Sequence, residues 1–449
     1  MISEIFYLLN FFFTFYFFLK YYIKKKEFNY FSPYFLYPII YFIYSYAGLL
    51  FYNENESDIF GNFLGKNIGT HYFITCSIGL YGILLGFLFT LKGQISYKVV
   101  PSIKPKSFNR LILIYFCLSI LLNYESVVSQ FNIFDVKSYA EMAFASRIEL
   151  RENKSFAIWE ILFQTTPTVL FIYACLEKFR SSKNIIKYVL LIPLLLLIVH
   201  SFLAGTRAVF VSYILFIFFY LYFNTTLFNT MSKKRGIILF SIFLSTYVLI
   251  NIIPIIRSAS NFYQMIDLFN NFYHQYGLSF LKLQNSSELQ TSINLQKLQH
   301  EIINNNASFM YGKNIINDLF VFLPRIFFEN RPLPTSELFV LKFYPDIYSQ
   351  GGGMGMFILI DGYWSFGNIG VLLTCFLFAI FISVMYNSII RAIKINRSAF
   401  YLFVIYFQTF IISSVRGGMI LSIRSFFLST FIFYIIAFIS KNLFFKSHE

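Results

Sequence analysis

The chain has 449 residues, of which 57% are hydrophobic and only 13% are charged. Soluble domains carry roughly a quarter of charged residues, and a soluble fold with this composition would also have an apolar exterior. The composition therefore excludes an ordinary soluble protein. It predicts an all-α, polytopic membrane helix bundle in which lipid covers the apolar side chains.

Apolar stretches long enough to cross a bilayer as helices recur along the chain, and we predict about eleven spans within a single transmembrane domain over residues 1–449. In chain order the spans are Ile2 to Ile23, Pro33 to Tyr52, Ile68 to Leu91, Leu111 to Val128, Phe156 to Glu177, Tyr188 to Leu203, Arg207 to Phe223, Gly236 to Ile256, Phe366 to Tyr386, Ala399 to Val415 and Met419 to Ile439.

The net charge of +15 is concentrated in alternate loops between these spans. Runs such as Lys24 to Lys26 and Lys233 to Arg235 are typical of cytoplasmic loops under the positive-inside rule. This pattern places the N-terminus outside and the C-terminus in the cytoplasm. Because the charge is accounted for by membrane orientation, it gives no reason to expect a nucleic-acid partner.

Two external segments are predicted, a short loop over residues 129–155 and a large one over residues 257–368. The large loop carries apolar residues at helical spacing from Phe262 to Tyr276 and from Ile293 to Ile302. These runs predict amphipathic helices that lie on the membrane or on each other. The proline-rich stretch from Pro324 to Pro345 is expected to be irregular.

The end of the large loop is the best candidate for a pocket. Glycines from Gly351 to Gly355 precede an apolar run, Met356 to Ile360, that is too short to span the membrane and is interrupted by Asp361 and Gly362. Such a pattern favours re-entrant backbone, which is tolerated at membrane depth only where protein or a water-filled cavity surrounds it.

Arginines at the external membrane edge are the first candidates for chemistry, because a charge there is costly without a role or a partner. Guanidinium groups bind phosphate oxygens in a bidentate manner, so the set suits a lipid-linked phosphate or pyrophosphate. The alternative is that these side chains only anchor helices at the interface. The set consists of Arg147, Arg207, Arg257, Arg325, Arg331, Arg416 and Arg424.

Asp361 is the candidate general base, because a partly desolvated carboxylate can accept a proton from a hydroxyl. Its alternative role is structural, capping a short helix or pairing with an arginine. Glu337 and Asp346 are further candidates for the base, and Trp364 is a candidate for stacking on a sugar ring. No histidine pair has metal-site spacing, and the cysteines fall in predicted spans. We therefore expect neither a metal nor a cofactor.

A turn Gly205-Thr206-Arg207 that enters a span, a large late external loop, and the segment GMGMFILIDGYWSFGNIG from Gly353 to Gly370 together resemble a known family. They are similar to the bacterial O-antigen and capsule repeat-unit polymerases, the Wzy-type oligosaccharide polymerases. Members of that family usually have glutamate where this chain has Asp361.

The resemblance implies a membrane glycosyltransferase of the bacterial cytoplasmic (inner) membrane, with a GT-C-like polymerase or ligase architecture. It implies inverting, metal-independent transfer of a growing glycan from undecaprenyl pyrophosphate to the terminal sugar hydroxyl of another lipid-linked unit. Asp361 would be the base, and Arg207, Arg257 and Arg325 would hold the pyrophosphate. Membrane lipid and a chain-length regulator are the other candidate partners.

Two alternatives stay open. A lipid-linked oligosaccharide flippase or transporter would serve the same substrate, although transporters tend to show internal repeats and short loops on both faces. An O-antigen ligase would use the same lipid-linked donor. The face of the membrane on which single repeats accumulate in a deletion strain discriminates the flippase from the transferases.

Overall fold

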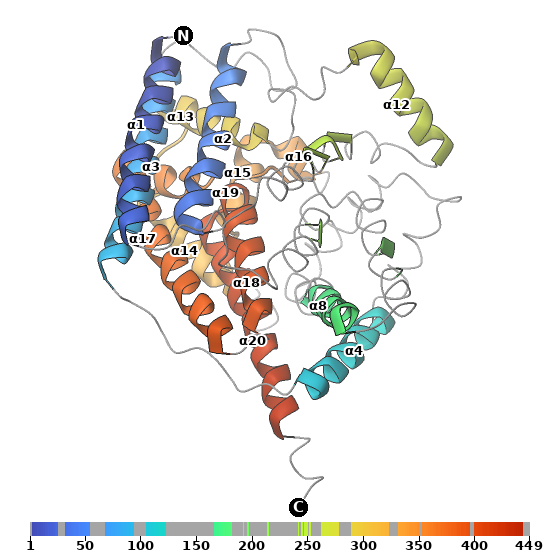
Figure 1. Ribbon diagram of the computed structural model, residues 1–449. Coiled ribbons are helices and arrows are strands. Elements are labelled where there is room, and N and C mark those ends of the chain that lie inside the picture. Colours follow the sequence, from blue (N-terminus) through green and yellow to red (C-terminus); the bar gives the residue numbers. More distant parts are fainter. Residues whose placement is uncertain are drawn as a thin grey trace, which may run out of the picture. The chain divides into compact units, whose positions relative to one another are not determined.

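The computed structural model describes the chain in separate stretches, drawn as ribbon in Figure 1. The described residues are 2–25, 32–53, 68–93, 105–122, 166–181, 262–277, 289–322, 331–349, 353–395 and 399–442, with short pieces between 192 and 252.

Every named element in these stretches is a helix, which confirms the all-α fold class. Four helices are long and apolar enough to cross a membrane, and they cover Ile5–Lys25, Thr70–Lys92, Leu359–Lys394 and Met419–Ser440. The protein is therefore an integral membrane protein. The number of spans beyond these four stays a prediction.

The described helices coincide with many of the predicted spans. The N-terminal ones are α1 (Ile2–Lys25), α2 (Pro33–Asn53), α3 (Ile68–Lys92), α4 (Pro105–Leu122) and α8 (Thr166–Ser181). The C-terminal ones are α17 (Leu359–Ile395), α18 (Phe400–Tyr406), the π-helix η7 (Phe407–Ser413), α19 (Ser414–Gly417) and α20 (Met419–Asn442). The predicted spans from Tyr188 to Ile256 lie mostly outside the described residues.

The chain divides into two compact units, residues 1–100 with 283–427 and residues 101–282 with 428–449. The prediction that residues 1–449 form one transmembrane domain is not tested by this division. The first unit contains α1 to α3 and α13 to α19, and the described residues of the candidate site lie within it.

The core of the first unit is the packing of α3 against α17. A Cβ atom on Gly82 would lie 2.8 Å from the carbonyl oxygen of Leu372, and one on Gly86 would lie 2.5 Å from that of Phe376. Since only glycine lets the two backbones approach this closely, these positions bring the helices into contact. Aromatic residues tie α1 and α2 to this pair, since the ring centres of Tyr7 and Phe73 lie 5.7 Å apart and those of Tyr37 and Phe378 lie 6.0 Å apart.

The second unit is described only in part. Its helices α4 and α8 pack through Phe116 and Phe171, whose rings stack at 3.9 Å. The hydroxyl groups of Thr166 and Ser429 lie 3.3 Å apart, and Phe108 meets Phe433 edge to face. These contacts tie α4 and α8 to the C-terminal part of α20.

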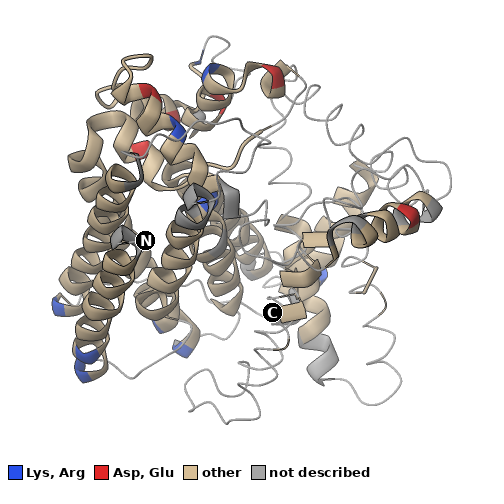
Figure 2. Ribbon diagram, turned by 90° about the horizontal axis from the view of Figure 1, so that it is seen from above, with Lys and Arg blue, Asp and Glu red and all other residues tan. Residues whose placement is uncertain are grey.

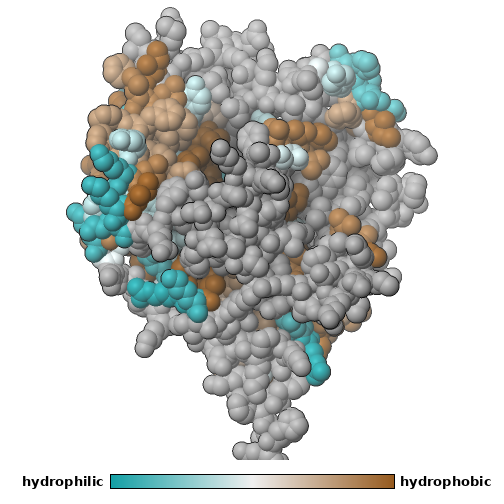
Figure 3. Space-filling model, viewed as in Figure 1, coloured by the Kyte–Doolittle hydropathy of each residue, from teal (hydrophilic) through white to brown (hydrophobic). Residues whose placement is uncertain are grey.

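The two ends of the first unit differ in charge, as Figure 2 shows. Basic residues occupy the last turns of α1, α3 and α17, namely Lys24, Lys25, Lys92 and Lys394. The acidic residues that the structure describes in this unit gather at the opposite end, where further basic residues also lie. Between the ends, the outward side of α1 is apolar, with Phe6 and Phe13 more than 60% exposed (Figure 3). This is the surface that a lipid bilayer covers, and the charge separation is the kind that the positive-inside rule describes.

The large loop contains the predicted helices, but one of them packs in an unexpected way. Both α12 (Phe262–Tyr276) and α13 (Ile293–Ile303) are helical, as predicted. Only α12 has an exposed apolar face, which includes Ile266 and Tyr273. In α13 the polar side chains Gln296 and Gln299 are buried together with Leu295, because this helix packs against α3 and α17 instead of lying on a surface.

The proline-rich stretch is not irregular throughout, so that prediction was wrong over its second half. Helix α15 (Thr335–Phe343) begins directly after Pro334, and α16 (Pro345–Ser349) follows. Proline is compatible with the start of a helix, because the first amide groups of a helix have no partner within it. Here the amide of Thr335 donates instead to the carboxylate of Asp318 in α14 (Lys313–Leu319).

Candidate active site

The centre of the candidate site is a helical hairpin within α17. The helix is interrupted at Phe366 and Gly367, where Gly367 has a φ of +60°. The short segment before the break folds back on the long segment, so that a Cβ atom on Gly370 would collide with the carbonyl oxygen of Gly362. Glycine supplies both the left-handed turn and the close approach. This is the geometry expected of a re-entrant segment, and it explains the glycines of the motif.

The segment directly before the hairpin is held against α19. The amide of Met356 donates to the carbonyl oxygen of Arg416 at 2.7 Å, and the amide of Ile358 donates to that of Val415 at 3.1 Å. Two regions separated by about sixty residues in sequence therefore meet through backbone hydrogen bonds. The predicted pocket region and two of the predicted arginines, Arg416 and Arg424, consequently belong to one structural assembly.

Asp361 lies in the short segment of the hairpin and is only 2% exposed. Its Oδ2 accepts a hydrogen bond from the amide of Met419 at 3.0 Å, so the carboxylate caps the N-terminus of α20. Within the described part of the chain, Oδ1 of Asp361 has no hydrogen-bond partner. A buried carboxylate oxygen of this kind is costly, and it is available to a proton or to a substrate hydroxyl group.

Two glycines lie next to this carboxylate. Gly418, with a φ of +82°, lies so close that a Cβ atom on it would be 3.3 Å from Oδ2 of Asp361. Gly417 is next to it, and a Cβ atom there would meet nothing within 4 Å. A turn without side chains, at Gly417 and Gly418, therefore lies beside Asp361.

A network of polar side chains fixes the position of the Asp361 backbone. The Nδ2 of Asn314 donates to the carbonyl oxygen of Asp361 at 2.9 Å. The hydroxyl group of Ser365 lies 2.7 Å from both this carbonyl oxygen and Oδ1 of Asn314, and its single proton serves one of them at a time. Asn314 and Ser365 are fully buried. Their role is to hold the segment that carries the carboxylate.

A second buried acid, Asp318, lies one helical turn after Asn314. It accepts hydrogen bonds from the backbone amide of Thr335 at 2.6 Å and from the Thr335 hydroxyl group at 2.7 Å, which makes it the cap of α15. Burial raises the pKa of the Asp318 carboxyl group to about 6, although the hydrogen bonds from Thr335 oppose this rise. Asp318 and Asp361 also repel each other electrostatically.

We expect the substitution Asp318→Asn to flatten the pH dependence of stability. The folded protein binds this proton more tightly than the unfolded chain, whose aspartate pKa is near 3.8. The stabilisation is therefore fully present below pH 3.8 and is lost as the pH rises through about 6. The unfolding temperature of the purified protein, measured between pH 4 and 7, reports this pH dependence, and the exposed Asp346→Asn variant is the control. Parallel profiles for the wild type and Asp318→Asn would contradict this account.

The described arginines lie around the hairpin and the turn. Arg416 is half-buried in α19, and its Cγ and Nε atoms would be 3.1 Å from a Cβ atom on Gly355. Arg424 is buried in α20, at 6% exposure, five residues after Met419. Arg331 is half-buried just before α15. Arg147, Arg207, Arg257 and Arg325 lie outside the described residues, so their roles stay predictions.

Trp364 is part of the protein core rather than an open platform. Its side chain is 1% exposed and its Nε1 donates to the carbonyl oxygen of Ser308 at 3.3 Å. The rings of Phe339 and Phe343 pack on it, and the ammonium group of Lys342 lies 5.9 Å from its ring centre. Stacking of Trp364 on a sugar stays a prediction, which requires these neighbours to move.

The other candidate acids differ from Asp361 in their surroundings. Glu337 is half-buried in the first turn of α15, and Asp346 is exposed in α16. Sequence reasoning missed Asn314 and Asp318 altogether. Their signal is weak, since polar residues at positions 314, 317 and 318 of a loop helix look like a solvated face, and only the fold shows that they are buried.

Comparison with known proteins gives one family. The family model described as O-antigen polysaccharide polymerase Wzy matches residues 1–448. No curated protein and no solved structure matches the chain.

Proposed function

The chain belongs to the O-antigen polysaccharide polymerase Wzy family, and from this premise we propose how it joins its substrates. As a member of that family, it is a polymerase that acts on lipid-linked oligosaccharide repeat units. In our proposal the donor is a growing glycan on undecaprenyl pyrophosphate, and the acceptor is the terminal sugar hydroxyl group of a second lipid-linked unit.

The proposed reaction is an inverting displacement at the anomeric carbon of the donor. The acceptor oxygen forms a bond to this carbon while the bond between the carbon and the pyrophosphate oxygen breaks. The proton of the acceptor hydroxyl group passes to Asp361, and undecaprenyl pyrophosphate leaves with the electron pair of the broken bond. Positioned bases contribute about 10²- to 10⁴-fold to such reactions.

The observation that carries this proposal is the state of the Asp361 carboxylate. One oxygen is used to cap α20, and within the described residues the other has no hydrogen-bond partner. A purely structural cap needs only one oxygen. The acceptor approaches across the turn at Gly417 and Gly418, whose displacement opens the way to Oδ1.

Arginines complete the proposed site. Arg207, Arg257 and Arg325 bind the pyrophosphate and stabilise the charge that develops on it as the bond breaks. Arg416 and Arg424 lie in α19 and α20, on either side of the turn at Gly417 and Gly418, which supports a role for arginines near Asp361. Arg147, Arg331 and Trp364 contribute to binding of the saccharide.

The proposed setting is the bacterial cytoplasmic membrane. About eleven spans, arranged as in GT-C-like polymerases and ligases, carry the external loops over residues 129–155 and 257–368. The N-terminus faces outward and the C-terminus faces the cytoplasm. Membrane lipid surrounds the bundle, and a chain-length regulator is a candidate partner.

Complementation of a polymerase-null strain tests the function and the site separately. We expect the wild-type gene to restore a ladder of polysaccharide lengths, and Arg207→Ala and Asp361→Ala to leave single repeats on the external face. An absent ladder with the wild-type gene would refute the polymerase in that host. A ladder of unchanged length from both variants would refute the site and leave the family function intact.

A further inference from the structure

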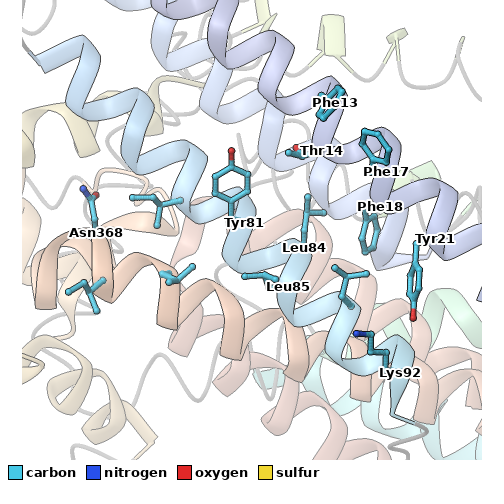
Figure 4. A pocket seen from close by; sticks show the side chains of 14 residues that line it. Phe13, Thr14, Phe17, Phe18, Tyr21, Tyr81, Leu84, Leu85, Lys92 and Asn368 are labelled. Atoms are coloured by element: carbon cyan, nitrogen blue, oxygen red, sulfur yellow. The ribbon is translucent and has the colours of Figure 1, made fainter.

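An apolar groove of about 940 Å³ runs along the membrane-facing side of the first unit, between α1, α3 and the start of the long segment of α17 (Figure 4). Its walls are almost entirely hydrocarbon and aromatic. The side chains of Phe13, Phe17, Tyr81, Leu84, Leu85 and Leu372 are among those that line it.

The two ends of the groove are polar and differ in chemistry. Lys92 lies at one end, in the last turn of α3, and Asn368 lies at the other, as Figure 4 shows. The lining runs along α3 from Ile78 to Lys92, a rise of about 21 Å at 1.5 Å per residue. This is about two thirds of the roughly 30 Å hydrocarbon core of a bilayer.

The side chain of Asn368 lies at the end of the groove, next to a buried polar contact between α13 and α3. The buried Gln299 donates to the Thr75 hydroxyl oxygen at 2.8 Å, and that hydroxyl group lies 2.8 Å from Oδ1 of Asn368. The single proton of this hydroxyl group serves either Oδ1 of Asn368 or the carbonyl oxygen of His71, which lies 2.9 Å away. The Nδ2 of this half-buried amide makes no hydrogen bond within the described part of the chain.

The Asn368 end of the groove is also the end nearest in sequence to the candidate site. Asn368 directly follows the break at Phe366 and Gly367, seven residues after Asp361. A long hydrocarbon chain in the groove would thus have its polar head beside the hairpin. A phospholipid with its head at Lys92 would instead present its acyl ends to Asn368, where an amide donor would remain unsatisfied, at a cost. A phospholipid with its head at Asn368 would satisfy this donor, and the crosslinking experiment below distinguishes it from a polyprenyl-linked saccharide.

We propose that this groove binds the polyprenyl chain of the lipid-linked saccharide, with Asn368 donating a hydrogen bond to an oxygen of the phosphate end. This inference rests on the proposed function, since it takes the lipid-linked unit as the substrate. The aromatic and aliphatic walls contact the isoprenoid chain, and Lys92 extends its apolar stem along the far end of the groove toward the interface.

Two leucines of nearly equal exposure make a matched test. Leu85 in α3 lines the groove and is 51% exposed, whereas Leu373 in α17 is 52% exposed and does not line it. We expect Leu85→Trp to fill the groove and reduce polymer formation by about tenfold or more, the equivalent of 1.4 kcal/mol in binding. Leu373→Trp should form polymer as the wild type does, and equal membrane levels of both variants exclude a folding defect.

A photoreactive benzoylphenylalanine at each leucine identifies the occupant directly in membranes of a strain that makes the lipid-linked repeats. We expect a polyprenyl-saccharide adduct by mass spectrometry at position 85 and none at position 373, with the position-85 adduct weakened by Asn368→Leu. Phospholipid adducts alone at position 85, or identical adducts at both positions, would contradict binding of the polyprenyl chain in this groove. The wild-type ladder in the same strain separates this result from failure of the proposed function.

Discussion

The variant Asp361→Asn is expected to produce almost no polymer while it remains folded in the membrane. Asparagine is as good an N-cap as aspartate, so its side-chain oxygen can still accept the hydrogen bond from the Met419 amide. It cannot accept the proton of the acceptor hydroxyl group. Loss of a base predicts a decrease of about 10²- to 10⁴-fold in polymerisation, measured as the ratio of longer chains to single repeats on polysaccharide gels.

Two further variants make this experiment decisive. Asp361→Ala removes the cap as well, at a typical cost of about 1 kcal/mol, so it should also lower the thermal stability of the purified protein. Asp346→Asn removes an exposed acid of the same external segment and should leave the ladder unchanged. A normal ladder from Asp361→Asn would mean that this carboxylate only caps α20.

The second large effect is expected at the contact between the short and the long segment of the hairpin in α17. A Cβ atom on Gly370 would overlap the carbonyl oxygen of Gly362 and would lie 3.2 Å from Cβ of Phe366. Since the colliding atom is a backbone oxygen, Gly370→Ala must move the short and the long segment apart. Overpacking of this kind typically costs about 1–3 kcal/mol, and a displacement of about 1 Å in a catalytic group can cost about 100-fold in rate.

We therefore expect Gly370→Ala to abolish the ladder and lower the unfolding temperature. The matched control is Gly353→Ala in the same motif, because a Cβ atom there would meet nothing within 4 Å. Its ladder and its unfolding temperature should equal those of the wild type. If both alanine variants behaved alike, the result would contradict the close contact between Gly362 and Gly370.

Local sequence patterns anticipated much of the architecture. The boundaries of α1, α2 and α3 agree with the predicted spans to within two residues, because about 20 apolar residues bounded by polar ones leave few alternatives for a helix in lipid. The helical spacing of α12 was equally clear. Re-entrant backbone was predicted from glycines and an acid inside a short apolar run, since such a run can neither span the bilayer nor stay exposed. The structure shows the fold-back within α17, and its depth in the membrane stays a prediction.

The surroundings of the site were less predictable, because they depend on contacts between distant segments. Burial of Gln299 in α13 follows from its packing against α3, and a single amphipathic pattern does not reveal which side will be covered. The start of α15 at Thr335 depends on Asp318, seventeen residues earlier. Proline at positions 332 and 334 indicated a loop, whereas the hydrogen bond from Thr335 to Asp318 stabilises the start of a helix.

The sequence by itself determined that this chain is a membrane protein, which of its long apolar segments are helical, and that Asp361 and a set of arginines are the candidates for chemistry. Those properties follow from composition and from periodicity along a single stretch. Only the tertiary structure decided that Asp361 caps α20, that Asn314 donates a hydrogen bond to its carbonyl oxygen, and that Asn368 lies at the end of an apolar groove. These facts depend on which residues meet across long sequence separations, where close packing and hydrogen-bond satisfaction select one arrangement.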